Sequence, residues 1–139
     1  MSKLRPSGRV YLYVEDDPLS RQVMELMAGS VLGDVRLIVF ENTENFMDRL
    51  AALDTIPDLI LLDVHIRPVD GFEVLATLRL DERYAHVPVI ALTASVMAEE
   101  IAHLHIGGFD GAIGKPISVS TFPGLIQRIL AGEAVWHVV

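Results

Sequence analysis

Short apolar runs alternate along the chain with longer amphipathic segments. The apolar runs have the length of β-strands, and we place these strands at residues 9–14, 35–40, 58–63, 87–92 and 109–113. The run Leu59–Leu62 is continuously apolar, which is typical of a parallel strand that helices cover on both faces. Strands that alternate with segments of helical length predict an α/β protein built on a parallel sheet.

The amphipathic segments predict a helix after each strand. These helices lie at residues 18–31, 43–53, 71–82, 96–106 and 120–131. Pro18 is a favoured first helical residue. The next three helices have candidate N-caps at Thr43, Asp70 and Ser95. In the last helix we expect Pro123 to lie in the first turn, where its missing N–H costs little.

The composition limits the possible functions. The chain has 139 residues, enough for one domain with a packed core. Its formal net charge of -8 argues against direct binding to nucleic acid, which needs clustered Lys and Arg. No apolar run is long enough for membrane insertion or for a signal peptide, so we expect a cytoplasmic protein. The sequence contains no cysteine, which excludes disulfides and zinc–sulfur sites.

Four polar motifs stand where the predicted strands end. They are Val14-Glu15-Asp16-Asp17, Leu61-Leu62-Asp63, Ala91-Leu92-Thr93-Ala94 and Gly114-Lys115-Pro116. Ligand sites of open parallel sheets form outside the carboxyl ends of the strands. Three carboxylates, a hydroxyl and an ammonium should therefore meet at one edge of the sheet, as a phosphoryl-transfer site requires.

Together, the four motifs and their spacing resemble the response-regulator receiver (CheY-like) family over about residues 8–131. The stretch from His86 to Ile117 looks most like small stand-alone receivers of the DivK type. The resemblance implies a flavodoxin-like, doubly wound parallel sheet of five strands in the order 2-1-3-4-5, with five helices. Residues 132–139 would form a short apolar C-terminal extension, anchored on the domain or in an interface by Trp136.

The resemblance also implies the roles of three side chains. Asp63 matches the phosphoacceptor, whose carboxylate attacks a phosphohistidine to form an aspartyl phosphate. Thr93 matches the hydroxyl that bonds one phosphoryl oxygen, and Lys115 matches the ammonium that reaches the others. Family members have a cis peptide before the proline that matches Pro116, so we expect a cis Lys115–Pro116 bond.

A magnesium ion is the implied cofactor. Glu15 and Asp16 match the acidic pair that binds the metal together with Asp63, and the backbone carbonyl of His65 matches a further ligand. Carboxylate and carbonyl oxygens are the ligands that suit Mg²⁺, which also accepts phosphate oxygen. Asp17 lies one residue beyond the matched pair, and we interpret it as a surface or helix N-terminal charge.

The implied function is that of a single-domain response regulator in a two-component phosphorelay. It would receive its phosphoryl group from a sensor histidine kinase or a histidine phosphotransfer protein, and signal by contact with a downstream protein target or as a homodimer. The chain after residue 131 is too short for a DNA-binding output domain. Such a protein is not an enzyme, beyond promoting its own phosphorylation and dephosphorylation.

Three positions depart from the family pattern. Arg67 stands where proline is usual, and Pro68 follows it. His65 puts an imidazole beside the path of the hydrolytic water, where it either acts on that water or is an exposed loop residue. Ala112 replaces an aromatic residue whose ring turns inward on activation. Coupling therefore cannot use that ring, and we expect Met97 to fill the space instead.

The same fold is also compatible with two other functions. The departures at Arg67 and Ala112 give some support to a non-phosphorylated pseudo-receiver that acts only as an interaction module. The intact Asp63, Thr93 and Lys115 count against it. A flavodoxin-type flavin protein needs a phosphate-binding loop after the first strand, and Glu15–Asp17 would repel that phosphate.

Overall fold

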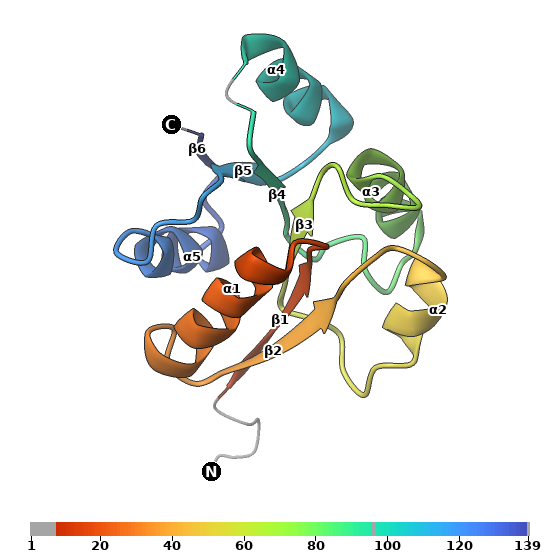
Figure 1. The fold of residues 1–139 in the computed structure, drawn as a ribbon. Coiled ribbons are helices and arrows are strands. Elements are labelled where there is room, and N and C mark those ends of the chain that lie inside the picture. The colour runs from red at the N-terminus through yellow and green to blue at the C-terminus, as the bar shows by residue number, and fades with distance from the viewer. Residues whose placement is uncertain (1–7, 96, 139) are drawn as a thin grey trace.

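The computed structural model describes residues 8–95 and 97–138, which form one six-stranded parallel sheet with helices on both faces (Figure 1). In chain order the elements are β1 (Arg9–Val14), α1 (Pro18–Ser30), β2 (Val35–Phe40), α2 (Phe46–Ala51), β3 (Leu59–Asp63), α3 (Gly71–Leu80), β4 (Val89–Thr93), α4 (Ala98–Gly107), β5 (Gly111–Gly114), α5 (Phe122–Leu130) and β6 (Val135–His137). The strand order is β2-β1-β3-β4-β5-β6, so the order reverses at β1 and β3.

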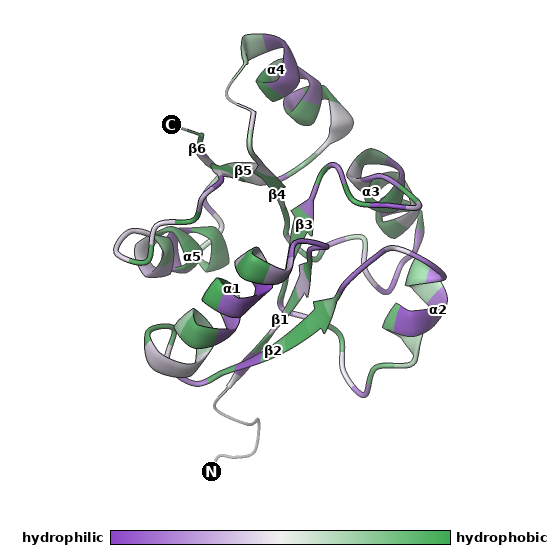
Figure 2. Ribbon diagram, viewed as in Figure 1, coloured by the Kyte–Doolittle hydropathy of each residue, from purple (hydrophilic) through white to green (hydrophobic). Residues whose placement is uncertain are grey.

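The two faces of the sheet bury alternate residues of each strand. One face packs against α2, α3 and α4, and the other packs against α1 and α5. In β3, Ile60 and Leu62 face the first layer while Leu59 and Leu61 face the second, and none of the four is exposed. Figure 2 shows hydrophobic strands at the centre of the molecule, and helices that carry both hydrophobic and hydrophilic positions. Burial of a side chain of this size contributes roughly 1.5–3 kcal/mol, which explains why β3 is continuously apolar.

The predicted fold class and the order of the first five strands are confirmed, but the sheet has six strands rather than five. The C-terminal extension adds β6 in parallel beside β5. Gly132 allows this path, because its left-handed backbone (φ 95°) turns the chain at the end of α5. The N–H of Gly132 donates to the carbonyl of Ile129, and the N–H of Glu133 donates to that of Arg128, both at 3.0 Å.

Three predicted features of the helix starts are confirmed. Pro18 is the first residue of α1, and Asp70 caps α3 by accepting a hydrogen bond from the N–H of Glu73 at 3.0 Å. α5 begins at Phe122, with Pro123 in its first turn. Residue 96 of the predicted fourth helix and residue 139 of the predicted extension lie outside the described residues.

Two predicted N-caps are wrong. α2 begins at Phe46 with Asn45 at its N-cap, so Thr43 precedes the helix. The Thr43 hydroxyl is buried instead against Val69, where it donates to the carbonyl at 2.6 Å and accepts from the N–H at 2.7 Å. α4 begins at Ala98 with Met97 at its N-cap, so Ser95 also lies before its helix. β4 likewise begins two residues later than expected.

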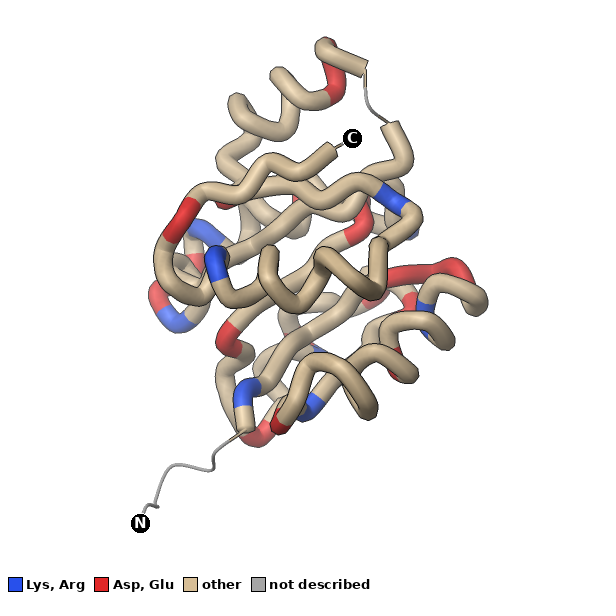
Figure 3. Tube along the Cα trace, turned by 90° about the vertical axis from the view of Figure 1, so that its left-hand side faces the viewer, with Lys and Arg blue, Asp and Glu red and all other residues tan. Residues whose placement is uncertain are grey.

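None of the helices described within residues 8–95 and 97–138 has the length and hydropathy needed to cross a bilayer. On the surface, Lys and Arg positions are interspersed with Asp and Glu over several elements (Figure 3).

The two bonds of Thr43 join the loop after β2 to the loop after β3, so Thr43→Val should destabilise the fold. The substitution leaves both backbone groups of Val69 without this partner, and we expect the free energy of unfolding to fall by about 2 kcal/mol. Urea denaturation measures the loss. Thr77→Val is the matched control, because Thr77 is exposed and bonds only within α3. Equal losses in the two variants would contradict a special role for Thr43.

Candidate functional site

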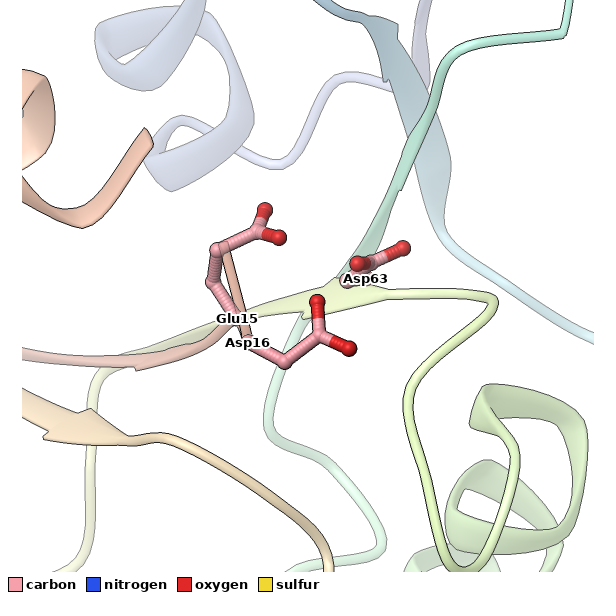
Figure 4. A group of neighbouring side chains, drawn as sticks. All are labelled: Glu15, Asp16 and Asp63. Atoms are coloured by element: carbon pink, nitrogen blue, oxygen red, sulfur yellow. The ribbon is translucent and has the colours of Figure 1, made fainter. Parts of the chain in front are cut away.

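Three carboxylates meet at the carboxyl edge of the sheet, where the strand order reverses (Figure 4). Glu15 and Asp16 follow β1, and Asp63 is the last residue of β3. One carboxylate oxygen of each lies within 4.8 Å of the others. Glu15 is fully buried and Asp63 is 5% exposed, whereas Asp16 is exposed. The group therefore offers oxygen ligands at a point that solvent reaches from one side.

Lys115 supplies the positive charge of the cluster. It directly follows β5, and its backbone N–H donates to the carbonyl of Thr93 at 2.8 Å. Its Nζ lies 3.1 and 3.4 Å from the two carboxylate oxygens of Glu15 and 3.5 Å from Oδ2 of Asp63. The ammonium of Lys115 thus contacts two largely buried carboxylates. Solvent ions screen this attraction less than they screen an ion pair on the surface.

Thr93 ends β4, the strand beside β3, and its side chain is buried. In the sheet it lies opposite Gly114, the residue before Lys115. Its Oγ1 accepts a hydrogen bond from the N–H of Ser95 at 3.0 Å. The predicted hydroxyl therefore stands at the same edge of the sheet as the predicted ammonium and carboxylates.

The loop after β3 holds Asp63 in place. The N–H of His65 donates to Oδ1 of Asp63 at 3.1 Å. The N–H of Gly71, the first residue of α3, donates to the carbonyl of Val64 at 2.9 Å. A Cβ at Gly71 would lie 2.9 Å from Cα of Val64, so this turn needs glycine. The His65 imidazole is mostly exposed, and its Nε2 lies 3.0 Å from Oε1 of Glu100 in α4.

The sequence did not predict three contacts of the site. The hydroxyl of Tyr13 donates to Oε1 of Glu15 at 3.4 Å, and the guanidinium of Arg21 donates to the Glu15 carbonyl at 3.1 Å. The contact between Tyr13 and Glu15 could have been predicted, because residues two apart in a strand point to the same face. Nothing in the sequence indicates the third contact, the hydrogen bond between His65 and Glu100, since the two residues lie 35 positions apart.

The departures from the family pattern leave the carboxylate group intact. Arg67 is exposed, and its carbonyl accepts a hydrogen bond from the N–H of Thr43 at 3.0 Å. The Arg67–Pro68 peptide is cis, as is Lys115–Pro116, which confirms the expectation for the latter. Ala112 is fully buried in β5, away from the strand end.

Burial and mutual charge shift the protonation of the site. Burial, followed by the nearby charge of Asp63, raises the pKa of Glu15, although Lys115 opposes the shift. Burial also acts to lower the pKa of Lys115, but the carboxylates of Asp63 and Glu15 outweigh it and the net pKa is raised. Burial and the charge of Glu15 raise the pKa of Tyr13, so its hydroxyl keeps the proton that it donates.

The raised pKa of Glu15 makes the stability of the metal-free protein depend on pH. Folding tightens proton binding to Glu15, so this contribution to stability is complete below the ordinary value of 4.5 and is lost as the pH rises through the folded pKa. A chelator keeps the protein free of metal. Under these conditions, the free energy of unfolding of the wild type should fall as the pH rises from 4.5 towards neutrality, when it is measured relative to that of the Glu15→Gln variant. Urea titrations of both proteins across this range measure the difference. If the difference in free energy between the two proteins does not change with pH, the pKa of Glu15 is not raised by folding.

Comparison with known proteins supports the predicted family and fold. Residues 11–127 match the model of the family described as the response regulator receiver domain. The polar-differentiation response regulator DivK of Brucella anthropi is 35% identical over 125 residues, which cover 88% of this chain and 96% of DivK.

Solved structures show the same architecture. The receiver domain of a sensor histidine kinase from Pseudomonas aeruginosa, with a magnesium ion coordinated in its active-site cleft, has a TM-score of 0.78 and 26% identity, covering 91% of this chain and 100% of that one. A chemotaxis response regulator of Vibrio cholerae has a TM-score of 0.78 and 20% identity, and the match covers 88% of this chain and 99% of that one. At this identity the likeness supports the fold alone. This chain belongs to the response regulator receiver family, as a CheY-like domain of the DivK type.

Proposed function

We propose that this receiver accepts a phosphoryl group on Asp63, with Mg²⁺ held by Glu15, Asp16 and Asp63, and that Thr93 and Lys115 bind the phosphoryl oxygens. The observation that carries the proposal is the meeting of three carboxylates within 4.8 Å, beside a lysine that reaches two of them. Similarity to DivK, whose name describes a response regulator, supports a role in a phosphorelay.

The donor set fits Mg²⁺. Glu15, Asp16 and Asp63 offer only hard oxygen ligands, and the exposed side of Asp16 leaves room for the waters that the ion retains. The backbone carbonyl of His65 is a further proposed ligand. When bound, the ion would neutralise charge and orient the phosphoryl group. Burial and the charge of Asp63 raise the pKa of Glu15, which supports this fit, because a bound cation would compensate for both effects.

Asp63 is the proposed nucleophile of the transfer. Its carboxylate oxygen forms the bond to phosphorus as the bond from phosphorus to the histidine nitrogen breaks, and the imidazole leaves with that electron pair. The hydrogen bond from the His65 N–H to Oδ1 fixes the carboxylate, which leaves Oδ2, on the side of Lys115, to attack.

Lys115 and Thr93 would act on the transferred group. Lys115 shares its charge between Glu15 and Asp63, so a metal that takes over the charge of Glu15 would leave the ammonium for the phosphoryl oxygens. The Thr93 hydroxyl uses a lone pair to accept from the N–H of Ser95, and its own hydrogen therefore remains available to a phosphoryl oxygen.

The proposed phosphodonor is the phosphohistidine of a sensor histidine kinase or a phosphotransfer protein, and it would dock beside α1. A hollow of about 300 Å³ lies between this helix and the segment after β5, with Asp17 and Lys115 on its lining. Leu19 and Leu26 of α1 are 68% and 73% exposed. An apolar helix face next to the phosphoacceptor suits a helical partner. The phosphorylated form would then act on a downstream protein.

Incubation with acetyl phosphate and Mg²⁺ should add the mass of one phosphoryl group to the protein. Intact mass spectrometry measures the addition, and loss of the adduct in alkali or hydroxylamine identifies an acyl phosphate. Asp63→Asn should show no addition, whereas Asp17→Asn, which changes a neighbouring carboxylate outside the proposed ligand set, should behave as wild type. An unmodified wild-type protein would instead favour the pseudo-receiver function.

Magnesium alone should stabilise the protein. At a concentration one hundred times its dissociation constant, Mg²⁺ should raise the free energy of unfolding by about 2.7 kcal/mol. Asp16→Asn should weaken the binding seen by calorimetry, because it removes one charged ligand. Lys115→Ala should bind Mg²⁺ at least as tightly as wild type, because it removes the ammonium that competes for Glu15. Equal binding by wild type and Asp16→Asn would refute the metal site.

A further inference from the structure

The helix α4 is held to the rest of the domain by few contacts. Of its ten residues, all of them described, Leu104 alone is buried. Met97 at the N-cap is 61% exposed and Ile106 is 84% exposed. Met97, the residue that we expect to fill the space beside Ala112 on activation, is therefore exposed at the start of this helix in the state seen here.

Two stacked ring pairs hold α4 on its two sides. His103 stacks on Phe72 of α3, with ring centroids 4.2 Å apart and an angle of 19° between the planes. His105 stacks on Trp136 of β6, with centroids 3.5 Å apart and an angle of 17°. The two histidines point to different sides of the helix because they lie two positions apart. The C-terminal strand thus supports α4 on one side.

Trp136 lies where the sheet lacks an aromatic ring. It pairs with Ala112 across β5 and β6, and both side chains belong to the layer that packs against α4. Ala112 is fully buried, whereas Trp136 is partly buried against the same cluster. The indole therefore covers the face of β5 that a larger residue at position 112 would cover.

The glycines of β5 make room for β6. A Cβ on Gly111 would collide with the backbone carbonyl of Val135, and one on Gly114 would lie 3.3 Å from Cα of Val138. Val135 is 1% exposed and packs with α5. The C-terminal strand is consequently built into the fold, and its position places Trp136 against α4.

Two connections join α4 to the carboxylate cluster. Thr93 accepts the N–H of Ser95 at the start of the segment that leads into the helix. His65, whose N–H donates to Asp63, contacts Glu100 in the first turn of α4 through its ring. A displacement of Thr93 or of the loop after Asp63 would therefore act on α4.

We propose that β6 is a built-in restraint on α4. Through the stack of Trp136 on His105, the C-terminal strand holds the helix in the position seen here, and occupation of Asp63 by a phosphoryl group displaces α4 against this restraint. The inference rests on the proposed function at Asp63. By reciprocity, a contact that opposes the displacement lowers the affinity of the site for a phosphoryl group.

Beryllofluoride with Mg²⁺ is the probe, because it mimics the phosphoryl group on aspartate. Trp136 is the single tryptophan of the chain, so its emission reports directly on β6. We expect beryllofluoride to change the emission in wild type but not in Asp63→Asn. His105→Ala, which removes the stack at an exposed position, should raise the affinity for beryllofluoride about two- to tenfold, the range expected for one aromatic contact.

One further variant, Gly111→Ala, repeats the test, and two others are controls. His86→Ala, an exposed histidine outside α4, should leave the affinity unchanged. Gly111→Ala should displace β6 and raise the affinity as His105→Ala does, whereas Gly124→Ala, at a position with nothing within 4 Å, should not. Binding is followed by calorimetry as well as by emission, so that variants with altered fluorescence can be compared.

The outcomes separate this inference from the proposed function. If beryllofluoride binds wild type while the Trp136 emission stays constant, or if His105→Ala leaves its affinity unchanged or lowers it, the restraint is overturned and the function at Asp63 stands. If beryllofluoride does not bind wild type at all, both are overturned. Changed emission together with tighter binding by His105→Ala supports the restraint.

Discussion

The central constraint on this molecule is the placement of two largely buried carboxylates next to each other. Glu15 and Asp63 lie at the ends of adjacent strands, and the ammonium of Lys115 is shared between them. Removing an ionised carboxylate from water is costly unless a partner of opposite charge compensates it. The strand that delivers Lys115 therefore has to end at the same edge as the strands that deliver the acids, which a parallel sheet guarantees.

Much of this arrangement was readable in the sequence because polarity changes sharply where the strands end. Asp63 is the first polar residue after the run Leu59–Leu62, and it is also the last residue of β3. The meeting of Glu15, Asp16, Asp63 and Lys115 follows from that pattern together with the strand order. The same reasoning could not locate the imidazole of His65, since its partner Glu100 comes from a distant helix.

The wrong N-cap at Thr43 and the missing sixth strand also depend on contacts between residues that are far apart in the sequence. A threonine before a helix has the composition of an N-cap, but Thr43 finds two better-placed backbone partners at Val69. Ser95 likewise precedes α4 by too many residues to cap it. The strand β6 was not predicted, because a strand of three residues has too little periodicity to be recognised. Its pairing also depends on the glycines of β5, and nothing in the local sequence connects them with the C-terminal residues.

The sixth strand also changes what the sheet presents to solution. Without it, the edge would be β5, a strand of the sequence Gly-Ala-Ile-Gly, and the backbone N–H and carbonyl groups that face β6 would have no neighbouring strand. Bare edges of this kind are templates for pairing with other chains and for aggregation. β6 covers that edge and replaces it with a strand of three residues. A very short edge strand offers few groups to an incoming chain, so the extension also protects a signalling domain against unwanted self-association through its sheet.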